Sequence, residues 1–385
     1  MLVIIFWFCI ISVIYGYVGY PILLMAGSMF TSKGKKKYDV IDLWPRVDML
    51  IAAYNEEKVI GSKLKNCLTL DYPVDKFRVW VVSDGSIDKT NEIVQKYASE
   101  DERICLIALE RTGKSGAINK AISLLSGDVI VFSDANTEFE PQAVKNLVRN
   151  FADKTVGCVC GRLIYRNSGQ TISGKGEGFY WQYETLLKKL ESDIGYVSGA
   201  NGAIYSIRRG LFEPLPNGTV NDDFMISMRI VEKKFKCIYE EYAIAYEETA
   251  PTMESEFNRH VRDGAGHYIS VLHLIGLLNP LLGVRSFIYW SHRIVRWGLP
   301  FILVGLFCIN VLLLGRSLYQ VVFIIQCIFY VLAIAGLLAI RHKHLPFIIY
   351  APFYFCNLNA ALLIGFLKVV SGQQKMTWER TERVL

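Results

Sequence analysis

The sequence predicts an α/β domain that is held at a membrane by apolar helices at both ends of the chain. Residues 2–30 carry no charged side chain, and residues 297–340 carry only Arg316. The segment between them is polar and mixed in charge, and from Arg46 onward it alternates short apolar runs with helical patterns. Such alternation is typical of a parallel, doubly wound sheet covered by helices.

Composition limits the class of protein. With 385 residues, 52% of them hydrophobic, and a mean hydropathy of +0.28, the chain is too apolar for an ordinary soluble enzyme. Its polar middle, roughly 250 residues, suffices for one sizeable domain. The net charge of +6 is modest and does not indicate a nucleic-acid partner. The nine cysteines show no metal-ligand spacing, and we expect them to be reduced packing residues.

Residues 1–30 form the first predicted element, a transmembrane anchor long enough for a hydrocarbon core of about 30 Å. A cleaved signal peptide is the alternative, but the run is too long and has no basic start. A cluster of lysines follows directly, at positions 33 and 35–37. By the positive-inside rule, this loop and the domain after it face the cytoplasm, so the sequon at Asn217 escapes glycosylation.

Residues 44–250 make up the predicted α/β domain. Apolar runs predict strands at 47–53, 77–83, 103–109 and 128–133, separated by helices near 56–68, 88–99, 115–125 and 141–151. Beyond residue 155 the pattern is mixed, and it predicts strands at 156–165, 203–208 and 236–240 and helices at 176–191 and 222–233. Such folds bind ligands at the carboxyl ends of their strands, so the residues there are candidate site residues.

The C-terminal part is predicted to meet the membrane in two ways. Residues 251–294 are expected to lie at the interface, because 257–278 is amphipathic with His and Arg on one side. Residues 295–370 form a transmembrane region with spans at 297–315 and 318–340. The stretch 345–370 is long enough to cross, yet prolines and asparagines interrupt it, and whether it crosses decides the side of the tail 371–385.

Polar residues cluster where the predicted strands end. Glu56 lies just after the first strand, where no Gly-x-Gly-x-x-Gly follows to indicate a dinucleotide. Asp84 and Gly85 end the second strand; the carboxylate could accept from a base N–H or a ribose hydroxyl, although such a pair is also an ordinary turn. Asp134 ends the fourth strand, where a carboxylate is either a ligand contact or a helix cap.

The stretch Gly113-Lys114-Ser115 before a predicted helix imitates a P-loop. A P-loop needs glycine at position 108, where this chain has Ala108, so the sequence disfavours an ATPase. Lys114 near a helix start is still suited to meet a diphosphate, because its charge and the helix N–H groups act together.

Two further clusters admit both a structural and a functional interpretation. Asp222 and Asp223 open a helix, where carboxylates usually cap it and complement its dipole. Because one charge raises the pKa of its neighbour, the pair could also hold a general base. Arg259 and Arg262 lie about one turn apart on the interfacial helix, where they either reach toward lipid headgroups or clamp a leaving diphosphate.

The order of these clusters resembles the membrane-bound family-2 glycosyltransferases, the group that includes cellulose, chitin and hyaluronan synthases. The resemblance runs from Arg46 to Arg383 and implies a GT-A-like fold with a nucleotide-sugar donor. The nucleotide-binding residues that it implies are Ala53, Tyr54, Glu56, Asp84, Lys114, Asp134, Arg262, Trp378 and Arg383. For the acceptor we assign Gly199, Asn201, Gly202 and Trp181.

The same resemblance implies roles for the acidic residues and the tail. Asp223, next to Asp222, occupies the place of the family's catalytic base. The segment from Trp378 to Arg383 is similar to the gating motif that closes over the nucleotide, which would put the tail in the cytoplasm.

The chain departs from the family pattern at two positions. Asn136 replaces the second Asp of the Asp-x-Asp motif. The ligands of Mg²⁺ or Mn²⁺ would then be Asp134, with Asn136 beside it, together with the diphosphate and water. Asp263 replaces the Trp of the Gln-x-x-Arg-Trp motif that is associated with processive synthases. The arginine of that motif is kept as Arg262.

We therefore expect a multi-pass enzyme of the inner or plasma membrane that transfers a sugar with inversion from a nucleotide diphosphate donor, with a UDP-sugar favoured. The expected acceptor is a lipid-linked saccharide or a growing polysaccharide, and membrane lipids are further partners. One alternative is a processive synthase that also translocates its polymer, for which chains would have to associate into homo-oligomers. Another is a non-catalytic membrane protein that binds nucleotides.

Overall fold

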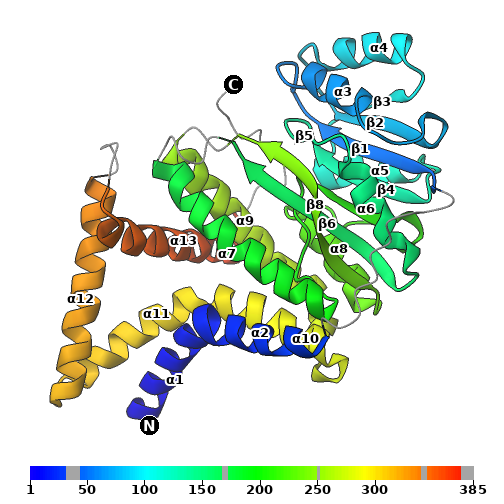
Figure 1. Cartoon of the computed structure of the whole chain (residues 1–385). Helices are drawn as coiled ribbons and strands as arrows, with labels where there is room; N and C mark the ends of the chain where they lie inside the picture. The colour runs from blue at the N-terminus through cyan, green and yellow to red at the C-terminus, as the bar shows by residue number, and fades with distance from the viewer. Residues whose placement is uncertain (32–43, 167–171, 249–251, 340–344, 374–385) are drawn as a thin grey trace.

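The computed structural model describes residues 1–31, 44–166, 172–248, 252–339 and 345–373, with side chains from residue 181 onward in the helix that follows the second gap. Figure 1 shows an α/β domain on one side of a group of long apolar helices. The two N-terminal helices lie beside the C-terminal helices α10 and α11.

The sheet has eight strands in the order β3-β2-β1-β4-β7-β6-β8-β5. Its first four strands pair in parallel, as the sequence predicts: β1 (Val47–Ala53), β2 (Phe77–Asp84), β3 (Ile104–Leu109) and β4 (Val129–Asp134). The central strand β1 is buried along its whole length. Its alternate residues face two apolar cores: Met49 and Ile51 pack on one, and Leu50 and Ala52 pack on the other.

The second half of the sheet is not parallel throughout. Strand β7 (Tyr205–Arg208) runs antiparallel to both β4 and β6 (Val156–Tyr165). Strand β8 (Lys236–Glu247) pairs in parallel with β6 and continues beyond the predicted end at 240, and its far half pairs antiparallel with the short β5 (Glu138–Phe139). The mixed pattern after residue 155 thus corresponds to a mixed sheet.

Helices cover both faces of this sheet. Helices α3 (Ile60–Leu68), α4 (Thr90–Glu100) and α6 (Ala143–Val148) pack on one core, and α5 (Lys114–Ile122) and α8 (Asp222–Glu232) pack on the other. Helix α7 (Ile172–Ile194) joins the domain to the membrane helices, because Leu187 packs against Tyr20 and Leu24 of α2 (Tyr20–Thr31).

Four stretches of the described residues are long and apolar enough to cross a membrane: Leu2–Phe30, Val284–Leu312, Ser317–Leu338 and Phe347–Val370. The first contains α1 (Leu2–Ile14) and α2 joined by a π-helical turn, and the second contains α10 (Val284–Ile288) and α11 (Val295–Leu312) joined likewise. The other two are α12 and α13. The second therefore begins thirteen residues before the predicted start at 297.

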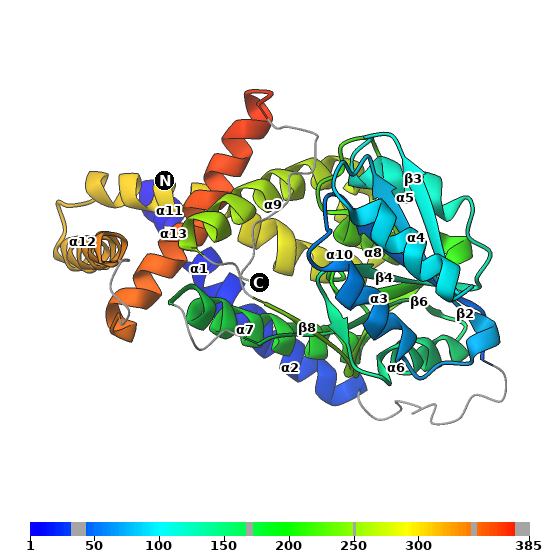
Figure 2. The ribbon, with the colours of Figure 1, turned by 90° about the horizontal axis from the view of Figure 1, so that it is seen from above.

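Helix α9 (Met253–His273) packs closely against α13, which crosses it in Figure 2. A Cβ at Gly365 of α13 would lie only 2.7 Å from the backbone nitrogen of Ala265 of α9, so only glycine permits this crossing. Figure 1 shows α13 crosswise to α12 rather than alongside it. Whether α13 crosses the bilayer stays a prediction.

Candidate active site

Three predicted site residues meet at the carboxyl edge of the sheet. Lys114 is the first residue of α5, Asp134 is the last residue of β4, and Asp222 is the first residue of α8. The ammonium nitrogen of Lys114 lies 3.3 Å from an oxygen of Asp134 and 3.1 Å from an oxygen of Asp222. The lysine thus holds together two carboxylates from distant parts of the sequence.

Asp223 has the electrostatics of a base that works near neutral pH. Burial, and secondly the charge of Asp222, raise the pKa of Asp223 to about 7, against the opposing charge of Lys114. Gly202 lies between this carboxylate and Asp134, since a Cβ there would be 3.6 Å from an oxygen of each. The missing side chain leaves space beside both acids.

The loop from Ser198 to Gly202 is fixed in place by its own backbone. Gly199 has φ +122°, and a Cβ there would lie 2.7 Å from the ring of Phe224, so only glycine fits. The amide of Ala200 donates to the hydroxyl of Ser227 at 2.9 Å, and Asn201 is buried with its amide nitrogen unpartnered among the described residues. Three predicted acceptor-side glycine and asparagine residues therefore form one loop next to the two acids.

The residues at the ends of β1 and β2 that were predicted to bind the nucleotide contact the loop before Lys114. Asp84 is buried and accepts from the amides of Thr112 at 2.6 Å and Gly113 at 3.0 Å, so it holds the loop that leads into Lys114. Arg111 from this loop also bonds Asp84 and lies 3.2 Å from the ring centre of Tyr54. The direct contact of Asp84 with a nucleotide stays a prediction.

Ala53 and Glu56 flank this loop, and both are buried. The amide of Glu56 donates to the hydroxyl of Thr90 at 2.8 Å. These two residues, with Tyr54 and Asp84, are not among the described residues that line the cavity at Lys114 and Asp134.

A cavity of about 360 Å³ runs from the acids to the membrane helices. At one end it is lined by Lys114, Asp134 and Asp223, and at the other by Tyr17 and Leu362. Tyr17 belongs to the π-helical turn between α1 and α2, and Leu362 belongs to α13. A ligand in this cavity would therefore touch both the carboxyl edge of the sheet and the apolar helices.

Helix α9 contributes one wall of the cavity with Arg259, Arg262, Asp263 and His267. A guanidinium nitrogen of Arg262 lies 3.6 Å from an oxygen of Asp263. One turn further on, the ring of His267 stacks on Trp297 of α11, with ring centres 4.5 Å apart and an angle of 14° between planes. An aromatic side chain thus lines this wall although Asp263 occupies the expected tryptophan position.

Trp181 also lines the cavity, and its indole donates to the carbonyl of Leu163 at 2.9 Å. Trp378 and Arg383 lie outside the described residues. The residues that sequence reasoning missed in the lining of the cavity include Lys188, Arg293 and Trp297. Lys188 lies in a predicted helix of the domain, and Arg293 and Trp297 lie at the start of a predicted membrane segment, and neither position carries a site signal.

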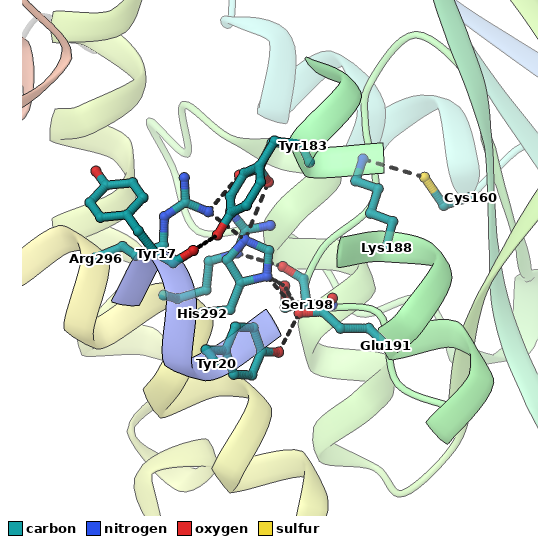
Figure 3. A network of polar contacts seen from close by, with 11 residues as sticks. Tyr17, Tyr20, Cys160, Tyr183, Lys188, Glu191, Ser198, His292 and Arg296 are labelled. Atoms are coloured by element: carbon teal, nitrogen blue, oxygen red, sulfur yellow. Dashed lines mark hydrogen bonds and ion pairs between the residues drawn. The ribbon is translucent and has the colours of Figure 1, made fainter. Parts of the chain in front are cut away.

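A network of buried polar groups lies under the acceptor-side loop (Figure 3). His292 is placed between Glu191, at 2.5 Å, and Glu184, at 3.2 Å. The same Glu191 accepts from the hydroxyl of Tyr20 at 2.6 Å and from the amide of Ser198 at 2.8 Å. The network therefore ties the N-terminal helix, α7 and the helix of residues 284–312 to the start of the loop.

The resemblance implies a bound divalent cation, for which the residues present must offer ligands. No group of three His, Cys, Asp or Glu side chains suited to a metal occurs within the described ranges. Asp134 is accessible at the cavity, and Asn136 donates its amide to Glu247 at 3.1 Å. One carboxylate with a neighbouring amide fits Mg²⁺ or Mn²⁺, because such ions take few protein ligands when phosphates and water supply the rest.

Comparison with known proteins assigns part of the chain to a family. Residues 48–213 match the sequence model of the family described as Glycosyl transferase family 2. This range holds Lys114, Asp134 and the loop of Gly199 to Gly202. Residues 48–213 therefore form a glycosyltransferase family 2 domain, as the motifs of the sequence predict.

Curated relatives are glycosyltransferases as well. The beta-monoglucosyldiacylglycerol synthase of a Nostoc species is 28% identical over 253 residues, which is 63% of this chain and 53% of that protein. The poly-beta-1,6-N-acetyl-D-glucosamine synthase of Staphylococcus aureus is 26% identical over 239 residues, or 60% of this chain and 57% of that protein. The chain spans about half the length of these relatives.

Among solved structures, the mannosyltransferase PcManGT from Pyrobaculum calidifontis, determined with GDP-Man and Mn²⁺, has a similar fold. The two superpose with a TM-score of 0.67 over 96% of this chain and 99% of that one, at 20% sequence identity. This likeness confirms the GT-A-like fold class with its flanking apolar helices.

Proposed function

We propose that this protein transfers a hexose, with inversion, from a nucleoside diphosphate sugar to a hydroxyl of an acceptor at the membrane. The observation that carries the proposal is Asp223. Its pKa of about 7 and its place in a cavity shared with Lys114 and Asp134 suit a general base. The donor is a UDP-sugar in our first hypothesis, and GDP-sugars belong in the test because PcManGT was solved with GDP-Man.

In the proposed reaction, Asp223 takes the proton of the acceptor hydroxyl as its oxygen bonds to the anomeric carbon. The bond from that carbon to the diphosphate breaks on the opposite face, and the nucleoside diphosphate leaves with the electron pair. Lys114 and Arg262, both in the cavity lining, offset the charge that develops on the leaving group. Asp134, with Asn136 beside it, would hold Mg²⁺ or Mn²⁺, which supplies further charge neutralisation to the diphosphate.

The acceptor is proposed to be lipid-linked. The cavity that holds Asp223 also touches Tyr17, Leu358 and Leu362 of the apolar helices, so a lipid-borne sugar can reach the acid from the membrane. The catalytic domain is proposed to face the cytoplasm, because the lysines after the first apolar stretch favour that side. Addition of one sugar at a time is favoured over processive synthesis, since Asp263 stands in the wall where a tryptophan would stack.

The test is release of nucleotide from a panel of UDP- and GDP-sugars by the full chain in lipid nanodiscs with Mg²⁺ or Mn²⁺. Wild type is compared with Asp223→Asn and with the control Glu213→Gln, a half-exposed carboxylate that pairs with Lys233 at 2.8 Å. The proposal expects release that needs an acceptor lipid and is lost in Asp223→Asn alone. Equal release by wild type and Asp223→Asn with every donor would refute the assignment of the base.

A further inference from the structure

Lys188 of α7 is a buried cation in the wall of the cavity. Lys188 is 6% exposed, and it lines the same cavity as Asp223. The ammonium nitrogen lies 3.9 Å from the sulfur of Cys160 (Figure 3). It also lies 5.3 Å from the ring centre of Trp181. Both are weak partners for a charge, since a thiol is a poor acceptor and a ring offers only its quadrupole.

The carboxylates nearest to Lys188 along α7 are engaged elsewhere. Glu184 accepts from Arg296 at 2.5 Å and faces His292, and Glu191 is bonded by His292 and Tyr20. Burial raises the pKa of the Cys160 thiol, so it stays protonated and brings no negative charge. Among the residues that the structure describes, no carboxylate lies within ion-pair distance of Lys188.

A buried ammonium without an anion is costly, and the usual remedy is a paired anion. Because Lys188 lines a cavity, that anion can come from a ligand. The same cavity is also lined by Arg293, whose Nε donates to the carbonyl of Ser198 at 2.7 Å. Leu358 and Leu362 of α13 line the cavity as well. An anionic group bound in it would therefore share the cavity with apolar side chains of a membrane helix.

We propose that Lys188 binds a phosphate ester that links the acceptor sugar to its lipid. The inference rests on the proposed function and narrows its acceptor from any glycolipid to one with a phosphate between sugar and chain. The phosphate lies beside Lys188, the chain leaves along α13, and the sugar hydroxyl extends to Asp223. The phosphate takes no part in bond making: the hydroxyl proton passes to Asp223 and the nucleoside diphosphate departs from the donor as above.

The experiment compares two acceptors that differ only in the linkage, a farnesyl glucoside and a farnesyl phosphoglucose, in phosphatidylcholine nanodiscs. Wild type is measured beside Lys188→Gln, Lys188→Arg and the control Lys189→Gln, which alters the neighbouring exposed lysine paired with Glu241 at 2.6 Å. Binding of each lipid is followed by native mass spectrometry, and acceptor and donor KM values come from nucleotide release. Glucose 1-phosphate serves as a soluble source of the same anion.

The expected result is at least tenfold tighter binding and lower KM for the phosphate-linked lipid in wild type, Lys188→Arg and Lys189→Gln. Lys188→Gln should lose the preference for the phosphate-linked lipid. Its KM values for the donor and for the neutral lipid should equal those of wild type. Equal handling of the two lipids by wild type would overturn the inference and leave the proposed function standing. If glucose 1-phosphate bound as tightly as the phosphate-linked lipid, the inference that the phosphate belongs to a membrane lipid would be overturned. Absent turnover with every acceptor would refute the proposed function, while the binding data still decide on Lys188.

Discussion

The Nδ1 atom of His292 lies 2.5 Å from an oxygen of Glu191, although the two residues are 101 positions apart in the sequence. The histidine comes from the helix of residues 284–312, and the glutamate from α7 of the catalytic domain. Ser198 at the start of the acceptor-side loop contacts both, with its hydroxyl 2.7 Å from His292 and 3.1 Å from Glu191. A membrane helix thus contacts the start of a loop that ends beside Asp134 and Asp223, the acids of the proposed site.

Loss of His292 should therefore destabilise the whole protein. His292→Leu leaves the buried Glu191 and Glu184 with one hydrogen-bond partner fewer, which costs about 1–3 kcal/mol. We expect a lower thermal midpoint in nanodiscs, measured by tryptophan fluorescence, and a much smaller loss for Ser198→Ala. In the double variant His292→Leu/Glu191→Leu the loss should be partly recovered, because the unpaired acid is gone. Additive losses would contradict the coupling.

Activity should follow the ionisation of Asp223. As a general base it works in its charged form, so kcat/KM should rise with pH and level off above about 7, the pKa of this carboxyl in the fold. Asp222→Asn removes a charge that raises this pKa, and the rising limb should move to lower pH. Lys114→Met removes a charge that lowers it, and the limb should move to higher pH. Asp223→Asn should reduce turnover by about 10²–10⁴-fold.

The measurement is the pH profile of nucleotide release at saturating metal, with Glu213→Gln as the control that leaves the profile in place. If the pH profiles of Asp222→Asn and Lys114→Met shifted in the same direction, the arrangement of Asp222 and Lys114 around Asp223 would be contradicted.

Two glycines of one loop should separate stability from activity. Gly199→Ala places a Cβ 2.7 Å from Phe224 at a φ of +122°, so we expect a loss of about 1–3 kcal/mol in unfolding free energy. Gly202→Ala places its Cβ at ordinary contact distance, 3.6 Å, from both Asp134 and Asp223. That variant should fold normally but fill the space beside the acids and lose turnover. Thermal midpoints and nucleotide release distinguish the two, and a stable, active Gly202→Ala would contradict the site.

Local patterns were enough to predict the parallel half of the sheet and the acids at its edge. Asp134 ends an apolar strand and Lys114 begins a helix, so the residues next to each of them in the sequence are enough to predict its position. The direction of β7 depends on its pairing with β4 and β6, which no local pattern encodes. Sequence reasoning could not find Lys188 because its significance arises from what the fold places around it.

The predicted start of the second membrane segment differs for a similar reason. The charged side chains before residue 297 led to the expectation that the helix begins after them, whereas one continuous helix starts at Val284. In the structure Arg296 is paired with Glu184 at 2.5 Å, and Arg293 bonds the carbonyl of Ser198 at 2.7 Å. Charges that turn into a cavity and find partners there do not end a helix. Hydropathy treats every charge as facing solvent and cannot distinguish this case.

Removal of divalent metal should abolish sugar transfer without unfolding the protein. No cluster of three His, Cys, Asp or Glu side chains suited to a metal occurs within the described ranges, and we expect EDTA to leave the thermal midpoint unchanged. Nucleotide release should cease in EDTA and return with Mn²⁺ or Mg²⁺. Asp134→Asn should raise the metal concentration needed for half-maximal rate more than tenfold, and Asn136→Asp should lower it by adding a second carboxylate. Full activity of wild type in EDTA would rule out the metal and leave Lys114 and the arginines as the groups that neutralise the diphosphate.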